Sequence, residues 1–360
     1  MTRRGPRRWA LLAGALAVVL TSSVAAALSD TVRGRLDART GSAGPGSGGS
    51  GGSANPLRDS AAGRSPAAYV LPAQPPRSPQ APRTGAWVGA WVRPALPTVQ
   101  GRLAAVADFE HQLGRPLDVS HVYHQWDDDF PAEDDRALAA AGHTVLLSWA
   151  GTDTRQIQAG LYDDVIRARA RDLRAWGVPV LLEWRWEMDR PNLQAEVWSP
   201  ADYVAAWQHL RAVFRQEQVD NVGWVWCPLA TGFVDGRAPA FYPGDAEVDW
   251  LCADTYPGRT LQPFATAVGP FLDWAAGHPQ PVLIGEFGMK KTLGERERQR
   301  WLVETGEFVM TRPQIKGLVY FDADRSDSTS DPFDTSLRQA PGSMAALARV
   351  AASPWFRTGR

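Results

Sequence analysis

The fold of this chain is decided by the stretch Pro179-Val180-Leu181-Leu182-Glu183-Trp184-Arg185-Trp186-Glu187-Met188-Asp189. A short apolar run opens it and passes directly into charged and aromatic residues. A second stretch, Pro281-Val282-Leu283-Ile284-Gly285-Glu286-Phe287-Gly288, has the same pattern. Continuous apolar runs of this length are typical of parallel strands that are covered on both faces. We therefore expect two buried strands, each leading into a glutamate.

Further short apolar runs alternate with longer amphipathic stretches on both sides of these segments. Helical periodicity is clearest over Tyr162–Trp176, Pro200–Glu217, Leu261–Ala276 and Glu295–Met310. A doubly wound open sheet usually has a glycine-rich turn after an early strand, but the first strand here is followed by Pro94-Ala95-Leu96-Pro97. The alternation therefore predicts an α/β fold of the (β/α)₈ TIM barrel class. Its predicted strands are Ala86–Val92, Val119–His124, Thr144–Trp149, Val180–Trp186, Val222–Trp226, Trp250–Asp254, Val282–Gly285 and Leu318–Phe321.

The N-terminal part of the chain differs in composition from the remainder. Residues 1–28 have a basic start and an apolar run, which indicates either a cleaved secretory signal peptide or an uncleaved membrane anchor. Residues 29–84 are rich in Gly, Ser and Pro, which predicts a disordered linker. Residues 85–360 form the predicted barrel domain. Both interpretations of the leader predict a domain outside the cell, either secreted or tethered to the membrane.

The charge and cysteine content limit the partners of this domain. Residues 1–84 hold 11 Arg and 3 Asp, which leaves 27 basic and 36 acidic residues in the domain. An acidic domain without a basic run argues against nucleic acid as a partner, and we expect a monomer. No cofactor or metal site is predicted, because Cys227 and Cys252 offer no metal-ligand spacing. Whether they form a disulfide is left open. Neighbouring parallel strands are a poor geometry for that bond, which favours two buried thiols.

Glu187 and Glu286 both follow apolar strand patterns, so we expect both at the C-terminal mouth of the barrel, where barrel enzymes hold their active sites. By strand alternation, Ile284 and Val282 should share the face of Glu286. Two carboxylates about 5–5.5 Å apart can hydrolyse a glycosidic bond with retention. One carboxyl group must then be protonated as the acid while the other is ionised as the nucleophile.

Aromatic residues near the predicted strand ends point to the same chemistry. The chain has 16 tryptophans, and aromatic rings stack well against the apolar faces of sugars. About half of the tryptophans are expected in packing instead, because tryptophan is well buried on average. The residues that we expect to line a polysaccharide cleft are Trp126, Trp149, Trp186, Trp226, Asp254, Tyr256, Arg185 and Tyr320.

Several of these segments resemble glycoside hydrolase family 26, best known for endo-β-mannanases. They are Gln158–Asp163, Trp184–Asp189, Tyr242–Asp245, Val248–Trp250, the pair Asp254 and Tyr256, and Ile284–Gly288. The resemblance covers most of residues 85–324 and implies a retaining (β/α)₈ glycosidase. It implies that Glu187 is the acid/base, that Glu286 is the nucleophile, and that Tyr256 contacts the nucleophile.

The chain departs from the family pattern in two places. Trp186 stands where the family usually has a histidine, and Glu183 stands where it usually has an arginine. Glu183 and Arg185 are expected on one strand face, where they could form a purely structural pair; the alternative hypothesis is that Arg185 is shared between Glu183 and a catalytic glutamate. The resemblance implies hydrolysis of a mannan-type β-linked polysaccharide. The alternatives are a retaining β-glucanase or xylanase of the same barrel class, and a non-catalytic protein of the cell surface that binds glycans.

Overall fold

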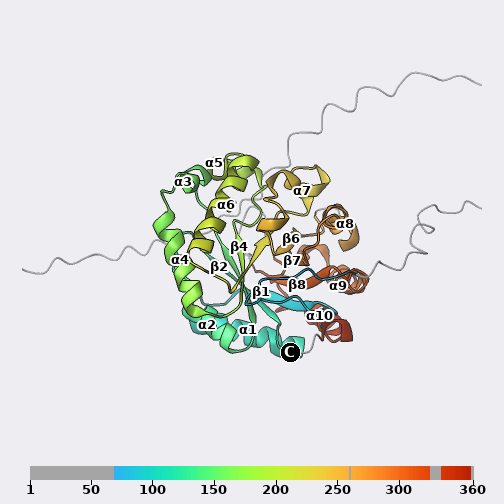
Figure 1. Cartoon of the computed structure of the whole chain (residues 1–360). Coiled ribbons are helices and arrows are strands. Elements are labelled where there is room, and N and C mark those ends of the chain that lie inside the picture. The colour runs from blue at the N-terminus through green and yellow to red at the C-terminus, as the bar shows by residue number, and fades with distance from the viewer. Residues whose placement is uncertain (1–68, 259–260, 325–333, 358–360) are drawn as a thin grey trace, which may run out of the picture. The chain divides into compact units, whose positions relative to one another are not determined.

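The computed structural model describes residues 69–258, 261–324 and 334–357. Eight parallel strands form a closed barrel in which each strand pairs with its neighbours in sequence and β8 pairs with β1 (Figure 1). The predicted TIM barrel is confirmed, and every predicted strand is present. The strands are β1 (Trp87–Val92), β2 (Val119–His124), β3 (Thr144–Trp149), β4 (Val180–Trp184), β5 (Val222–Trp226), β6 (Trp250–Thr255), β7 (Val282–Phe287) and β8 (Ile315–Asp322).

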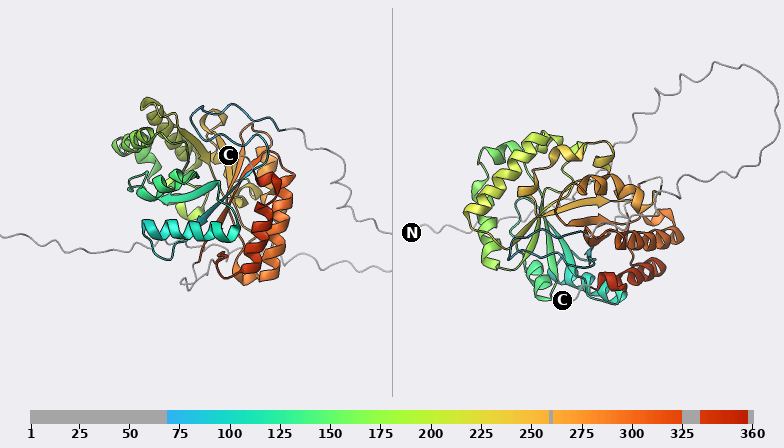
Figure 2. Two further views of the ribbon diagram at one scale, coloured as in Figure 1. Left: turned by 90° about the horizontal axis from the view of Figure 1, so that it is seen from below. Right: turned by 45° about the vertical axis from the view of Figure 1, so that its right-hand side comes forward.

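Helices surround the barrel, as the views in Figures 1 and 2 show. The α-helices are α1 (Val99–Leu113), α2 (Glu133–Ala140), α3 (Thr154–Gln158), α4 (Asp163–Trp176), α5 (Gln194–Val197), α6 (Pro200–Gln216), α7 (Thr231–Val234), α8 (Phe264–Ala275), α9 (Glu295–Met310) and α10 (Pro341–Ala351). Short 3₁₀ turns are η1 (Pro191–Leu193), η2 (Ala238–Phe241), η3 (Asp245–Glu247), η4 (Lys291–Leu293) and η5 (Pro354–Phe356).

Local sequence explains where these helices begin and end. Ser199 caps α6 by accepting a hydrogen bond from the amide of Asp202 at 3.1 Å, and Pro200 occupies the first helical position. Gly114 and Gly177 end α1 and α4 in the left-handed conformation that glycine adopts without strain.

Two apolar clusters fill the domain. The larger one lies between the strands and the helices. The smaller one fills the inside of the barrel and consists of Ala81, Val119, Leu146, Leu181, Val225, Cys227, Trp250, Cys252, Leu283 and Val319. Because side chains alternate along a strand, each strand contributes to both clusters. Leu146 of β3, for example, points inward, while Leu147 packs with the outer cluster.

A bulge in β7 breaks this alternation. Ala253 of β6 pairs with Ile284, but the next residue, Asp254, pairs with Glu286, so Gly285 is an extra residue in β7. Ile284 packs with the outer cluster and Leu283 with the inner one. The expectation that Ile284 and Val282 share the face of Glu286 is therefore wrong. The inserted glycine is what lets Glu286 face the barrel axis.

A disulfide joins Cys227, just after β5, to Cys252 of β6, with Cα atoms 4.3 Å apart. The expectation of two free thiols is wrong, since the two backbones approach closely enough at this point for a bond. Gly285 makes room for it: a β-carbon at position 285 would lie 2.5 Å from the sulfur of Cys252.

The last part of the predicted linker packs against the barrel. Tyr69 donates a hydrogen bond to the carbonyl of Pro279 at 2.7 Å, and Lys316 donates one to the carbonyl of Arg83 at 3.3 Å. Leu71 and Ala81 contact the inner cluster. The expectation of a disordered linker is therefore wrong for residues 69–84, because their few apolar side chains cover the N-terminal end of the barrel. Residues 1–28 and 29–68 lie outside the described residues. Among the described helices, none is long and apolar enough to cross a membrane.

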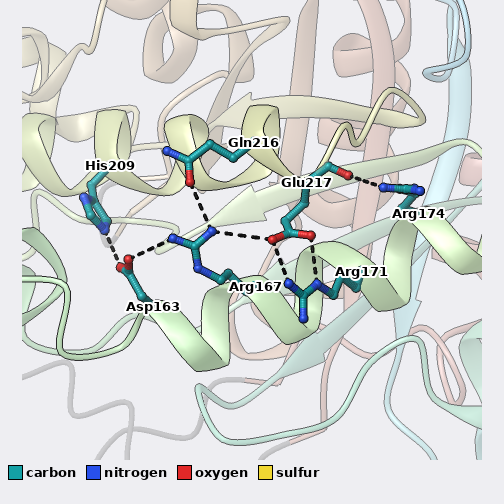
Figure 3. A network of polar contacts seen from close by, with 7 residues as sticks. All are labelled: Asp163, Arg167, Arg171, Arg174, His209, Gln216 and Glu217. Carbon is teal, nitrogen blue, oxygen red and sulfur yellow. Dashed lines mark hydrogen bonds and ion pairs between the residues drawn. The ribbon is translucent and has the colours of Figure 1, made fainter.

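An ion-pair network joins α4 to α6 on the surface (Figure 3). Glu217, which follows α6, accepts hydrogen bonds from Arg171 at 2.8 and 3.1 Å. Arg167 of α4 contacts both Glu217 and Asp163, and His209 of α6 contacts Asp163 at 2.6 Å. These contacts hold two neighbouring outer helices together, next to the segment that leads into β4.

Candidate active site

Glu187 lies in the turn that follows β4. The strand ends at Trp184, two residues earlier than predicted, because Arg185 and Glu187 adopt positive φ angles of 51° and 50°. Such angles are uncommon for residues with a side chain and cluster at functional sites. The amide of Glu187 donates a hydrogen bond of 2.7 Å to the carbonyl of Cys227, which fixes the turn against the end of β5.

Glu286 lies in β7 and is held by two tyrosines. Tyr123 of β2 donates a hydrogen bond of 2.5 Å to Oε1, and Tyr256, which follows β6, donates one of 2.5 Å to Oε2. Burial, with the charge of Glu286 as the next cause, raises the pKa of both tyrosines well above the usual value. Both phenols therefore keep their protons and act as donors to the carboxylate.

Three carboxyl groups converge at this end of the barrel. One oxygen from each of Glu187, Asp254 and Glu286 lies within 4.8 Å of the others, and all three residues are buried. The predicted meeting of the two glutamates is thus present in the structure. Side-chain oxygens of this kind could also bind a cation, but Arg190 already supplies a positive charge beside Glu187.

Burial raises the pKa of two of these three carboxyl groups. It raises the pKa of Glu187 to about 8, an effect that Arg190 opposes and Glu286 reinforces. Burial, together with the charges of Glu286 and Glu187, also raises the pKa of Asp254 well above its usual range. At neutral pH, Glu187 is therefore a carboxylic acid that can give up a proton, and it lies beside Glu286, whose two oxygens accept hydrogen bonds from two phenols. Two carboxyl groups in such different surroundings can serve as acid and nucleophile in one site.

The two arginines of the β4 turn have different partners from those expected. Arg185 donates a hydrogen bond of 2.6 Å to Glu196 and forms its ion pair there. The expected pair with Glu183 and the hypothesis that Arg185 is shared with a catalytic glutamate are both wrong, because the turn takes Arg185 off the inner face of β4. The guanidinium of Arg190 is the group that contacts the carboxyl group of Glu187.

Asp189 stabilises the same turn through contacts with the loop after β5. It accepts a hydrogen bond of 3.0 Å from the amide of Leu229 and lies 3.4 Å from the guanidinium of Arg237. A β-carbon at position 232 would lie 2.0 Å from Oδ2 of Asp189, so Gly232 leaves the space in which this carboxyl group is held. The turn that carries Glu187 is therefore tied to the loop after β5.

Partly exposed aromatic rings line the mouth beside Glu286. Trp186 packs edge-on against Tyr123, with ring centroids 5.1 Å apart, and Trp91 of β1 packs edge-on against Tyr123 at 5.9 Å. Trp91 also stacks on Phe321 of β8 at 4.6 Å. Of the predicted cleft residues, Trp186, Asp254 and Tyr256 lie in this region, next to Glu187 and Glu286.

The remaining predicted aromatic residues pack behind the barrel wall. Trp149 and Trp226 have no exposed surface, and their indole groups donate to the carbonyls of Trp126 and Phe241. Trp126 is buried in a parallel stack on Trp149, with centroids 4.5 Å apart. Tyr320 is buried and donates to the carbonyl of Thr335 at 2.6 Å. These side chains contribute to packing and offer no face to a ligand in this structure.

Sequence reasoning missed Tyr123, Arg190 and Trp91. Strand alternation could have found Tyr123, because Val119 and Tyr123 lie on the same face of β2 and Val119 belongs to the inner cluster. Arg190 lies three residues after Glu187, the spacing at which side chains in a helical turn meet. Trp91 lies at an inward position of β1 by the same alternation.

Solved structures with this architecture include a GH26 β-mannanase from Bacteroides ovatus, BoMan26A. It matches with a TM-score of 0.57 and 17% identity, over 76% of this chain and 90% of that chain. A Cellulomonas fimi endo-β-1,4-mannanase double mutant matches with a TM-score of 0.55 and 15% identity, over 75% of this chain and 71% of that chain. The chain has the fold of the GH26 β-mannanases. The resemblance read from the sequence is thus confirmed at the level of the fold.

Curated relatives include Endoglucanase H of Acetivibrio thermocellus, which is 25% identical over 284 residues, covering 73% of this chain and 30% of that protein. Beta-1,3-xylanase TXYA of a Vibrio species is 26% identical over 143 residues, covering 37% of this chain and 28% of that protein. The chain matches less than a third of the length of each of these relatives. No family model matches the chain.

Proposed function

We propose that this protein is a retaining endo-glycosidase that hydrolyses a β-linked polysaccharide through a covalent glycosyl-enzyme. The observation that carries the proposal is the approach of Glu187 and Glu286, whose nearest carboxyl oxygens lie within 4.8 Å. This separation is shorter than the about 6.5–9.5 Å of inverting enzymes, which must fit the attacking water beside the sugar, and is near the about 5–5.5 Å of retaining enzymes.

The roles of the two glutamates follow from the protonated state of Glu187 and from the two phenols that donate to Glu286. Glu187 gives its proton to the leaving oxygen while Glu286 attacks the anomeric carbon, so the glycosidic bond breaks as the glycosyl ester forms. Glu187, now a carboxylate, then takes a proton from water, and the oxygen of that water displaces Glu286 from the anomeric carbon. No cofactor takes part in these steps. A non-catalytic glycan-binding protein would gain nothing from two buried carboxyl groups in close approach, one of them protonated at neutral pH.

Mannan is the substrate type that we propose first. The solved structures with this fold are described as β-mannanases, and the segments around Glu187 and Glu286 resemble the same family. A β-glucan is the second candidate, since the curated relative that covers most of this chain is named an endoglucanase. Trp186, which replaces the usual histidine beside Glu187, is the residue most directly placed to alter the choice between these sugars.

A substrate screen with matched variants tests the proposal. The full chain is incubated with mannan, mixed-linkage β-glucan, β-1,4-xylan and β-1,3-xylan, and reducing ends are measured. We expect release from one of these polymers, with the β-anomer formed first by proton NMR, and no release by Glu187→Ala or Glu286→Ala variants that remain folded. Binding without release by the wild type, or an α-anomer as first product, would contradict the proposal.

We also propose that the domain acts outside the cell, either secreted or tethered through its N-terminal segment, as a monomer with a polysaccharide as its partner. The disulfide between Cys227 and Cys252 supports export, since such bonds persist in oxidising compartments. Fractionation of cells producing the tagged chain, with thiol labelling before and after reduction, tests this. The tag in the cytosol with two free thiols would contradict it.

A further inference from the structure

A chain of polar contacts runs inside the barrel from Glu183 to Glu286, and the catalytic steps above do not use it. Ser148 of β3 donates a hydrogen bond to Oε2 of Glu183. The hydroxyl of Ser148 lies 2.6 Å from Nε2 of His121, and Nδ1 of His121 lies 3.3 Å from the hydroxyl of Tyr123. Tyr123 then donates to Oε1 of Glu286 at 2.5 Å.

The direction of these hydrogen bonds is set by their two ends. Because the hydroxyl of Ser148 donates its proton to Glu183, its oxygen accepts from His121, and Nε2 must carry a proton. Because the proton of Tyr123 goes to Glu286, Nδ1 of His121 cannot accept it as well. The rings of His121 and Tyr123 are stacked, with centroids 4.3 Å apart, so this contact leaves Nδ1 able to carry a second ring proton.

Charge balance favours this doubly protonated state of His121. Glu183 is 1% exposed, and a buried carboxylate without a cation is strongly destabilising. Within the described part of the chain, the cationic partner of Glu183 is His121, whose Nε2 lies 3.4 Å from Oε2. Arg185, two residues further on, is bound to Glu196 and does not serve this role.

We propose that His121 is an imidazolium held by Glu183 and Ser148, and that it directs the single proton of Tyr123 toward the nucleophile. Glu183, Ser148 and His121 are then positioning residues that act through Tyr123. The inference that they affect catalysis rests on the proposed function, whereas the protonation of His121 does not.

The expected effect on the reaction is specific to one step. When water displaces Glu286, the bond between the anomeric carbon and the glutamate oxygen breaks, and its electron pair returns to the carboxylate. A phenol that donates to Glu286 stabilises this departing anion. The same hydrogen bond stabilises the free carboxylate before attack, so it does not favour formation of the ester. Loss of the contact should therefore slow hydrolysis of the glycosyl-enzyme and spare its formation.

Nitrogen-15 NMR of the histidine rings tests the protonation state without any substrate. The His121 signals are assigned by comparison with His121→Asn. We expect both ring nitrogens protonated in the wild type at pH 7, and an unprotonated Nδ1 in Glu183→Gln. An unprotonated Nδ1 in the wild type, or a ring that stays doubly protonated in Glu183→Gln, would overturn the proposal.

Kinetics with activated glycosides test the catalytic consequence. With 2,4-dinitrophenyl β-mannobioside or β-cellobioside, Glu183→Gln and Ser148→Ala should lower kcat about tenfold, the loss of one hydrogen bond, with kcat/KM little changed. The covalent intermediate should accumulate by intact mass spectrometry. Equal falls in kcat and kcat/KM would overturn this part. If the wild type cleaves neither glycoside, the proposed function has failed for these sugars, while the NMR result still decides the state of His121.

A matched control lies on the same strand. His124 of β2 also pairs with a buried carboxylate, Asp135, at 2.9 Å, but on the outer face of the barrel. Asp135→Asn removes a histidine–carboxylate contact of the same kind without touching the inner chain. We expect its kcat and kcat/KM on the same glycosides to equal those of the wild type. If kcat but not kcat/KM also falls in this variant, then the same pattern in Glu183→Gln and Ser148→Ala reflects a general loss of packing.

Discussion

The two ends of the barrel interior have opposite chemistry, although the same strands build both. At the N-terminal end, apolar side chains such as Leu146, Leu181 and Leu283 fill the space, and residues 69–84 cover them. At the C-terminal end, the buried residues include Glu183, Glu187, Asp254 and Glu286. Buried carboxyl groups destabilise a fold unless each finds a partner. The apolar end therefore provides the stability that allows the polar end to hold its acids out of water.

The largest expected effect, on both activity and stability, comes from changing Glu187 at the polar end of the barrel. Glu187→Gln removes the acid, and we expect kcat/KM to fall by about 10²–10⁴-fold. The same change should raise the melting temperature at pH 9. The pKa of Glu187 is about 8 in the folded state, above its ordinary value, so wild-type stability is lost as pH rises toward 8, whereas the amide stays neutral. Glu304→Gln, on the exposed face of α9, is the control and should change neither quantity.

A cavity at the apolar end should instead lower the stability of the fold and have little effect on activity. Leu146→Ala removes a fully buried side chain from the inner cluster, and we expect the free energy of unfolding to fall by about 2–5 kcal/mol. Leu146 pairs with His121 and lies one layer below Ser148 on the inner face of β3, so where the variant is folded kcat should fall by less than the tenfold expected of Ser148→Ala. Denaturant unfolding measures the loss, and Leu161→Ala, which is 70% exposed, should cost almost nothing. A large loss of kcat at full folding would contradict the division of roles.

Replacing Arg190, which contacts Glu187, should have a smaller effect that is confined to the pH dependence of kcat/KM. Glu187 must be protonated in the free enzyme, so the basic limb of kcat/KM should fall near pH 8. Arg190 lowers the pKa of Glu187 through its positive charge, so Arg190→Met should move this limb to higher pH. A pH–rate profile on the substrate found in the screen measures the shift. A limb that stays in place, or moves to lower pH, would show that another group titrates there.

The smallest effect is expected on the outer surface. Glu217→Gln removes the carboxylate that binds Arg171 and Arg167 between α4 and α6 (Figure 3). We expect the melting temperature to fall by about 1–2 °C, because exposed ion pairs contribute little. Hydrogen bonding to Arg171 lowers the pKa of Glu217, so the difference should be present above pH 5 and vanish as the carboxylate is protonated in acid. A difference that persists at pH 3 would indicate lost packing instead.

The sequence contained enough information for the barrel and for the convergence of Glu187 and Glu286, since both rest on local patterns: apolar runs, and acids directly after them. What it could not supply depends on geometry across strands. Arg185 faces Glu196 because the backbone leaves the strand conformation at that residue, which no periodicity records. Trp149, Trp226 and Tyr320 were predicted in the cleft because they lie near strand ends. Strand alternation places them outward, and that test was available from the sequence.

The disulfide and the ordered segment before the barrel were missed for a related reason. Whether Cys227 and Cys252 bond depends on how closely β5 and β6 approach at one level of the barrel. Whether residues 69–84 are ordered depends on the apolar end that they cover, since their own composition would leave them unfolded. Both outcomes are set by tertiary contacts that only the closed barrel creates.

The extra residue in β7 shows how little separates a barrel with this chemistry from one without it. Removing Gly285 would restore plain alternation, and the acid that follows Ile284 would lose its place among Tyr123, Tyr256 and Asp254. The remaining strands and helices would need no change. The position of Glu286 in the proposed active site thus depends on a single inserted residue within one strand.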